Sequence, residues 1–279
     1  MMAFLQSAIQ ILFAVFMVTA VFVMLPRAAA SAVRITEVLQ VVPEVNDPAQ
    51  PRAAGPIRGR VEFQDVTFQY PGAQEPALSG VSFTAGPGEV TAIIGGTGSG
   101  KSTLAGLIPR FYDVKAGRVL VDGIDVRDLR QHELRAKIGY VPQKAVLFSG
   151  TIATSLRFGN DRATADELRH AAGVAQAAGF IDAMPGGYES AVSQGGTNLS
   201  GGQKQRLAIA RALMRRAEIY VFDDSFSALD FATDARLRAA LRADTGAACL
   251  SAIKSVRPAP MASPQAPLPD QGRVAGIGT

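Results

Sequence analysis

A glycine-rich segment at residues 95–103, GGTGSGKST, carries residue types that bind phosphate. It follows a short apolar run at 89–94, predicted to be a strand, and it opens a helix predicted over about 101–109. The spacing matches the pattern G-x-x-x-x-G-K-[ST]. Such glycines let successive backbone N–H groups point at one anion, and the helix adds its positive N-terminal end. The sequence therefore predicts a phosphate site formed by Gly95, Gly96, Thr97, Gly98, Ser99, Gly100, Lys101, Ser102 and Thr103.

Two of these side chains have specific expected tasks. Lys101 is placed to reach the β- and γ-phosphates of a nucleotide, and the Ser102 hydroxyl is placed to ligate Mg²⁺. A matching carboxylate occurs in the run IYVFDD at 219–224, which reads as a buried strand ending in Asp223. We expect Asp223 to emerge beside the glycine-rich loop and to hold the Mg²⁺ shell, generally through water.

A second anion-binding pattern lies at 199–203, LSGGQ, directly before the helical stretch KQRLAIARALMRR. Ser200, Gly201 and Gly202 fall at the start of that helix, where backbone N–H groups lack partners within the helix. Both patterns cannot serve one nucleotide if they lie on different lobes of one chain. The economical solution is a head-to-tail pair, in which each nucleotide lies between the 95–103 loop of one chain and Ser200–Gln203 of the other.

With these three motifs together, the sequence resembles the ATP-binding cassette (ABC) family, in its exporter type, up to about residue 245. The resemblance implies an α/β fold, a P-loop NTPase of the ABC ATPase type. It also implies a mixed sheet core, an antiparallel β lobe near 60–90 and a helical subdomain near 160–215. ATP and Mg²⁺ are the implied cofactors. The implied partners are a second half-transporter, as a hetero- or homodimer, and an exported substrate.

The resemblance also assigns roles to single residues. Tyr70 would stack on adenine, although alone it would read as a half-buried strand residue. Gln143, in IGYVPQ, would contact Mg²⁺ and sense the membrane domain, and with Asp224 it forms the expected catalytic pair. The expected nucleotide-binding set is completed by Ser200, Gly201, Gly202 and Gln203 acting on the opposite site. His132 and His170 are expected on helix surfaces without a catalytic role.

The N-terminus predicts a membrane span, because residues 3–25 contain no charged side chain. As a helix this run would measure about 34 Å, enough for a hydrocarbon core of ~30 Å. A signal peptide would need a basic start and a shorter apolar run, and a buried core helix would usually be shorter and amphipathic. Arg27 and Arg34 follow the run, which puts its C-terminal side in the cytoplasm. We therefore expect a plasma-membrane protein with a cytoplasmic ATPase domain.

Composition limits the other possibilities. The net charge of +4 is spread along the chain, which argues against nucleic acid as a partner. The single cysteine cannot form an internal disulfide, and no Cys/His cluster has metal-ligand spacing. We expect a transmembrane helix with its cytoplasmic extension over 1–42, a proline-rich linker over 43–59 and the ATP-binding domain over 60–279.

Two departures from the ABC pattern stand out. Asp224 occupies the position where the family has Glu, so its carboxylate falls short of an attacking water and hydrolysis at the chain's own site should be slow. The run FDDSFSALD then resembles the degenerate-site half of heterodimeric exporters. Gln194, in SQGG, replaces an acidic residue usual in exporters.

The second departure covers 247–270, which has five prolines between 258 and 269 and no histidine. Prolines exclude a central strand, so we expect the family's strand and its switch His to be missing here. GRVAGIGT at 272–279 again resembles the closing strand. We hypothesise that the gene carries a pair of compensating frameshifts across about 249–269. The gene sequence tests this hypothesis, because another reading frame should then encode an apolar strand that ends in His or Gln.

The predicted function is ATP-driven export, performed by the C-terminal part of a half-transporter, because one helix cannot enclose a translocation path. One alternative is a catalytically impaired regulatory half or an inactive truncated remnant. Another is a soluble ABC ATPase of DNA repair or translation, against which the apolar N-terminus argues.

Overall fold

The computed structural model describes residues 1–53, 59–244, 248–253 and 277–278. Contacts between Cα atoms divide the chain into two units, Met1–Glu44 and Val45–Thr279. Each unit is described by itself.

The N-terminal unit is one continuous helix, α1 (Met2–Leu39), which runs through Pro26. None of its residues is buried within the chain, and it is long and apolar enough to cross a membrane. The prediction of a helix over residues 3–25 that continues beyond Pro26 is confirmed, and the helix ends at Leu39 rather than at residue 42.

The second unit begins with an antiparallel sheet whose strand order is β2-β1-β4-β5. Its strands are β1 (Val61–Phe68), β2 (Leu78–Ala85), β4 (Ala116–Val121) and β5 (Ile124–Asp125). The apolar residues of β1 that alternate along the strand are buried, as a sheet with one covered face requires. The predicted β lobe near 60–90 is therefore present, and β4 and β5 extend it with strands that lie later in the sequence.

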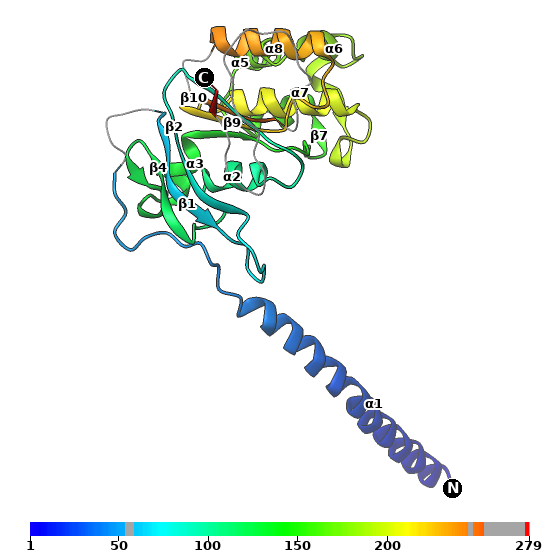
Figure 1. Ribbon diagram of the computed structural model, residues 1–279. Helices are drawn as coiled ribbons and strands as arrows, with labels where there is room; N and C mark the ends of the chain where they lie inside the picture. Colours follow the sequence, from blue (N-terminus) through cyan, green and yellow to red (C-terminus); the bar gives the residue numbers. More distant parts are fainter. Residues whose placement is uncertain (54–58, 245–247, 254–276, 279) are drawn as a thin grey trace. The chain divides into compact units, whose positions relative to one another are not determined.

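The core sheet has five strands in the order β11-β3-β10-β9-β6 (Figure 1). They are β3 (Val90–Ile94), β6 (Ile138–Val141), β9 (Ile219–Asp223), β10 (Ala248–Ile253) and β11 (Ile277–Gly278). β11 is antiparallel to β3, whereas β3, β10, β9 and β6 are parallel to one another. This confirms the predicted mixed sheet. All five residues of β9 are buried, as expected for a strand covered on both faces.

The prediction that 247–270 contains no central strand is wrong. β10 lies between β3 and β9, with Cys249 opposite Val90 and Ala252 opposite Asp223. Its sequence, ACLSAI, contains no proline and ends before Pro258, so the prolines do not interrupt the ladder. The remainder of that segment lies outside the described residues, as does most of the predicted closing strand. The two described residues of the predicted closing strand, Ile277 and Gly278, form β11, which pairs with β3.

Helices complete the second unit. Against the core sheet lie α2 (Lys101–Leu107), α3 (Gln131–Ala136) and α8 (Phe231–Asp244). α2 ends at Leu107, shortly before Pro109, which has no backbone N–H to continue the helical hydrogen bonds. Single 3₁₀ turns lie at Val126–Asp128, Gly187–Glu189 and Gln194–Gly196.

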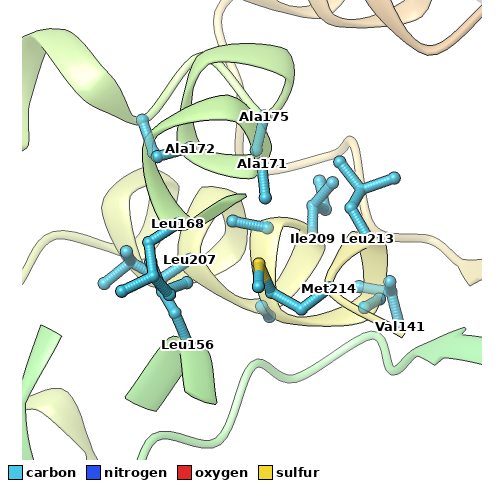
Figure 2. Packing of buried hydrophobic residues seen from close by; sticks show 14 of the residues in the cluster. Val141, Leu156, Leu168, Ala171, Ala172, Ala175, Leu207, Ile209, Leu213 and Met214 are labelled. Carbon is cyan, nitrogen blue, oxygen red and sulfur yellow. The ribbon is translucent and has the colours of Figure 1, made fainter. Parts of the chain in front are cut away.

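The predicted helical subdomain near 160–215 is present, and its apolar core is continuous with the core sheet through Val141, Tyr220 and Phe222. Its helices are α4 (Ile152–Arg157), α5 (Ala165–Val174), α6 (Ala178–Asp182) and α7 (Gly201–Leu213). The short strands β7 (Gly150–Thr151) and β8 (Ala191–Val192) form an antiparallel pair, with α4, α5 and α6 between them in the sequence. Figure 2 shows Leu168 of α5 beside Leu207 of α7, with Leu156 of α4 nearby. This core fixes the orientation of α7 and therefore of residues 200–203 at its start.

A buried ion-pair cluster joins the β lobe to the core sheet. The Lys137 ammonium contacts the carboxylates of Asp122 at 2.5 Å and Glu218 at 2.9 Å. The Asp122 side chain is only 1% exposed, and it also accepts a hydrogen bond from the backbone N–H of Arg60 at 3.0 Å. Burial of the Lys137 ammonium opposes its charged form, but the hydrogen bonds to Asp122 and Glu218 prevail and raise the pKa of Lys137.

We expect Lys137→Met to lower the free energy of unfolding by about 2 kcal/mol, because it leaves the Asp122 carboxylate buried without its cation. Chemical denaturation of the detergent-solubilised chain measures this loss. Lys115→Met is the matched control, since Lys115 is an exposed lysine whose ammonium, in the described part of the chain, donates to the Gln69 side chain.

The same pair predicts a pH dependence. Because the folded pKa of Lys137 is raised, its stabilisation is fully present below the unfolded lysine pKa of about 10.4 and is lost as pH rises through the folded value. The difference between wild type and Lys137→Met should therefore stay constant from neutral pH to mildly alkaline pH and shrink above that range. A difference that shrinks already near neutral pH would contradict this assignment.

Candidate functional site

The glycine-rich loop connects the end of β3 to the start of α2, as predicted. Gly98 and Gly100 have φ angles of 84° and 83°, a region that side chains with a Cβ atom rarely adopt. A Cβ atom on Gly100 would also lie 2.7 Å from the carbonyl oxygen of Ala77. The loop conformation therefore requires glycine at position 100 for two independent reasons.

We expect Gly100→Ala to lower the free energy of unfolding by about 1–2 kcal/mol from the left-handed backbone alone, with the contact to Ala77 adding to it. Gly96→Ala is the control within the same loop, because a Cβ atom there would meet nothing within 4 Å. Thermal unfolding of the two variants checks the difference. Equal melting temperatures would show that the loop does not have this conformation.

The Lys101 ammonium is held by the loop itself. Its Nζ donates to the carbonyl oxygens of Gly95 at 2.8 Å and Gly96 at 2.5 Å, and to the Ser99 hydroxyl at 3.1 Å. These contacts place a full positive charge at the loop carbonyls. An arriving anion with better acceptor oxygens can take over these hydrogen bonds without a large movement of the lysine side chain.

Ser102 and Asp223 meet although they are far apart in the sequence. The Ser102 hydroxyl donates to Asp223 Oδ1 at 2.8 Å, and the Tyr140 hydroxyl lies 3.4 Å from Asp223 Oδ2. Asp223 is buried, and this burial raises the pKa of its carboxyl, while the hydrogen bonds from Ser102 and Tyr140 act in the opposite direction. Burial likewise raises the pKa of Tyr140.

The donor set at this point fits a hard divalent cation. A hydroxyl, a carboxylate and the nearby Gln143 side-chain oxygen are the oxygen ligands that Mg²⁺ prefers. Among the described residues, no group of three or more His, Cys, Asp or Glu could hold a metal. A Mg²⁺ ion here would therefore depend on further oxygens from phosphate and water.

Gln143 and Asp224 contact each other across the same site. The Gln143 amide donates to Asp224 Oδ2 at 3.1 Å. Asp224 has a φ angle of 47°, in the left-handed region that Asp and Asn tolerate better than most residues. The side chain expected to be a shortened general base thus lies next to Asp223 in the chain, and its carboxylate accepts a hydrogen bond from the predicted loop glutamine.

Tyr70 lies beyond the end of β1, so the reading of Tyr70 as a half-buried strand residue is wrong. Its hydroxyl lies 2.9 Å from Thr103 Oγ1, and its ring packs edge-on against Phe68 and Tyr112. The ring stays 37% exposed. It borders a cavity of about 330 Å³ lined by Tyr70, Ala77, Thr97–Thr103, Gln143, Asp223 and Asp224.

Most of the predicted site residues thus converge on one cavity, but Ser200, Gly201, Gly202 and Gln203 do not line it. Ser200 is the N-cap of α7, where Ser200 Oγ accepts from the Gln203 N–H at 3.2 Å and Gln203 Oε1 accepts from the Ser200 N–H at 2.9 Å. A Cβ atom on Gly202 would lie 3.1 Å from the carbonyl oxygen of Ala228. The start of α7 therefore adjoins the loop 227–230.

Sequence reasoning missed Tyr140. It lies on β6 opposite Val221 of β9, which brings its hydroxyl to Asp223. Nothing in the local pattern IGYVPQ signals this contact, because it depends on the register between two strands. His132 and His170 are both exposed, as predicted, and His170 Nε2 lies 2.6 Å from Asp244 Oδ1.

Comparison with known proteins gives one matching family and several similar proteins. A family described as "ABC transporter" matches residues 78–227. An uncharacterized ABC transporter ATP-binding protein of Mycobacterium tuberculosis (strain ATCC 25618 / H37Rv) is 48% identical over 283 residues, which cover 100% of this chain and 48% of that protein. An ATP-dependent lipid A-core flippase of Thiobacillus denitrificans is 47% identical over 186 residues, covering 66% of this chain and 32% of the flippase.

A solved structure of a bacterial Atm1-family ABC exporter with ATP bound superimposes with a TM-score of 0.79 at 35% identity. The match covers 91% of this chain and 44% of the exporter chain. The chain therefore spans about half the length of the curated relatives it matches.

Proposed function

This chain belongs to the ABC transporter family, and we propose that it is the ATP-binding part of an exporter half-transporter. ATP binding would close a pair of such domains, and hydrolysis would reopen it. The observation that carries this proposal is the convergence of the glycine-rich loop, Lys101 and the Ser102–Asp223 pair on one cavity. We propose export across the plasma membrane, with an exported substrate of unknown chemistry.

In this proposal each loop group has a defined task toward Mg-ATP. The backbone N–H groups of residues 96–102 and the Lys101 ammonium bind the β- and γ-phosphates. Ser102, Gln143 and Asp223 hold Mg²⁺, which neutralises phosphate charge when bound. The Tyr70 ring, exposed at the border of the cavity, provides a flat apolar surface for adenine.

The start of α7 serves a nucleotide on a second chain. Ser200 accepts the Gln203 N–H through its oxygen, so its own hydroxyl proton remains available to an incoming phosphate. The start of α7 also adds the positive end of a helix of 13 residues. A head-to-tail pair of ATPase units places this group opposite the 95–103 loop of the partner, which is a second half-transporter, identical or different.

Because of Asp224, this chain would be the half of the dimer whose own site hydrolyses ATP more slowly. Its carboxylate is one methylene shorter than Glu and is already engaged by Gln143 at 3.1 Å. Positioning of the attacking water dominates phosphoryl transfer, so the chain's own site binds ATP and hydrolyses it slowly. A regulatory half without hydrolysis is the second candidate, favoured by Asp224 and by the absence of any histidine after His170 in the sequence.

The membrane assignment rests on α1. The helix is apolar, its residues are not buried in the chain, and Arg27 and Arg34 follow the uncharged run. These positive charges favour the cytoplasm, which puts the ATPase unit on that side. A soluble ABC ATPase of DNA repair or translation would have no use for such a helix, and recovery of the chain in the soluble fraction would support that alternative.

Crosslinking tests the head-to-tail arrangement. In a Cys249→Ser background, Gly96→Cys combined with Gly201→Cys should give a disulfide-linked dimer that depends on Mg-ATP. Both positions have open space around a Cβ atom. Gly96→Cys with Gly173→Cys is the control, since Gly173 lies on α5 and is also open. A crosslink that forms equally in both pairs, or none with ATP, would refute the arrangement.

A further inference from the structure

Two hydroxyl groups connect the end of β6 to the turn that follows β9. The Tyr140 hydroxyl lies 3.4 Å from Asp223 Oδ2, and the Ser225 hydroxyl donates to the carbonyl oxygen of Val141 at 2.9 Å. Neither Tyr140 nor Ser225 is among the residues that line the cavity bordered by Asp223. Any effect of these two hydroxyls on a ligand in that cavity would therefore pass through Asp223.

Ser225 holds the backbone of the turn. It is completely buried, with 0% of its surface exposed, and it directly follows the left-handed residue Asp224. The last paired residues of the two strands are Val141 and Phe222, so the bond from Ser225 continues the link between β6 and β9 beyond their ladder. The same hydroxyl lies 3.3 Å from the carbonyl oxygen of Asp223. Ser225 thus fixes the backbone from which the Asp223 side chain projects.

Tyr140 holds the side chain of Asp223 itself. The two carboxylate oxygens have different partners, because Oδ1 accepts a hydrogen bond from Ser102 at 2.8 Å while Oδ2 faces the Tyr140 hydroxyl. The Tyr140 ring is in turn held by an edge-on contact with Phe111, with the ring centroids 5.3 Å apart. Oδ1 is therefore the oxygen that shares a site with the Ser102 hydroxyl, and Oδ2 is the oxygen that Tyr140 can keep in place.

We propose that Tyr140 and Ser225 are positioning residues for the Mg²⁺ site. Tyr140 orients the Asp223 carboxylate, and Ser225 fixes the backbone that carries it. This inference rests on the proposed function, in which Ser102 and Asp223 hold Mg²⁺. Hydrogen bonds that fix the orientation of a metal-binding carboxylate strengthen metal binding, and the loss of such a partner weakens it by about 10–100-fold.

Binding of Mn²⁺ in place of Mg²⁺ tests this role. The full chain is titrated with Mn²⁺ in the presence of a non-hydrolysable ATP analogue, and bound Mn²⁺ is measured by electron paramagnetic resonance. Tyr140→Phe removes one hydroxyl but keeps the ring that packs against Phe111, and Ser225→Ala removes the other. Each variant should bind Mn²⁺ about tenfold more weakly or worse. Affinity for the analogue without a metal ion should stay unchanged, because neither variant alters the 95–103 loop.

Two variants that remove the same chemical groups elsewhere are the matched controls. Ser155 is also a buried serine, 4% exposed, and its hydroxyl has no hydrogen-bond partner among the residues that the structure describes. Tyr188 packs against the core of the helical subdomain and does not line the cavity. Ser155→Ala and Tyr188→Phe should therefore bind Mn²⁺ as tightly as the wild type.

The outcomes separate this inference from the proposed function. If Tyr140→Phe or Ser225→Ala binds Mn²⁺ with wild-type affinity, the role of the altered residue is overturned while the proposed ATP site stands. An equal loss of Mn²⁺ binding and of metal-free analogue binding would also overturn it, because the whole site would then have loosened. If the wild-type chain binds no analogue, the proposed function is wrong, and the two positioning roles are wrong with it.

Discussion

Lys101→Ala is expected to weaken binding of Mg-ATP to the full chain by at least about 100-fold. The Lys101 ammonium now satisfies the carbonyl oxygens of Gly95 and Gly96 and the Ser99 hydroxyl, all within the loop. In the complex it would exchange these for phosphate oxygens, and each hydrogen bond to a charged group contributes roughly 1.5–3 kcal/mol. Two such bonds correspond to a loss of about 100-fold or more.

Equilibrium binding of a fluorescent ATP analogue measures this loss. Lys115→Ala is the matched control, because it removes an equal charge from an exposed lysine whose ammonium contacts Gln69 among the residues that the structure describes. A thermal melt of each variant excludes unfolding as the cause. If Lys101→Ala binds ATP with an affinity within twofold of that of the wild type, the loop does not bind the phosphates. The proposed function would then be wrong as well.

The loop was predictable because its chemistry is local. Glycines, Lys101 and Ser102 act through their own backbone and immediate neighbours, so spacing alone indicates the phosphate cradle. The contact between Ser102 and Asp223 was also foreseeable, since both follow strands of a parallel sheet whose carboxyl ends meet at one edge. The resemblance to the ABC family, read from these motifs, is confirmed by the match over residues 78–227.

Features that depend on pairing between distant strands were not predictable in the same way. The position of β10 is set by its neighbours β3 and β9, which supply hydrogen bonds on both sides of a short, weakly patterned segment. The contact of Tyr140 with Asp223 follows from the register of β6 against β9. β4 and β5 belong to the same lobe as β1 and β2, although β3 and α2 separate the two pairs of strands in the sequence.

Asp224→Glu is expected to raise the ATPase rate of the full chain by at least tenfold, part of the roughly 10²–10⁴-fold that a well-placed general base contributes. The added methylene moves the carboxylate outward by about 1.5 Å, a C–C bond length, toward the cavity it already borders. ATP affinity should stay unchanged, because Lys101, Ser102 and Asp223 are untouched. Steady-state ATPase assays of the chain in lipid, with ATP affinity measured in parallel, check both statements.

Asp224→Asn is the informative control for this second variant, because Asn keeps the size of the side chain and tolerates the left-handed backbone at φ 47°. If Asp224 is already out of reach of the attacking water, its replacement by Asn changes the slow basal rate little while Glu raises it. A large drop with Asn and no gain with Glu would show instead that Asp224 is a working base. Glu carries a backbone cost of about 1 kcal/mol in this region. If Asp224→Glu has a lower melting temperature but a higher ATPase rate, the gain in rate cannot come from greater stability. The reach of the carboxylate would then be the feature that limits hydrolysis at this site.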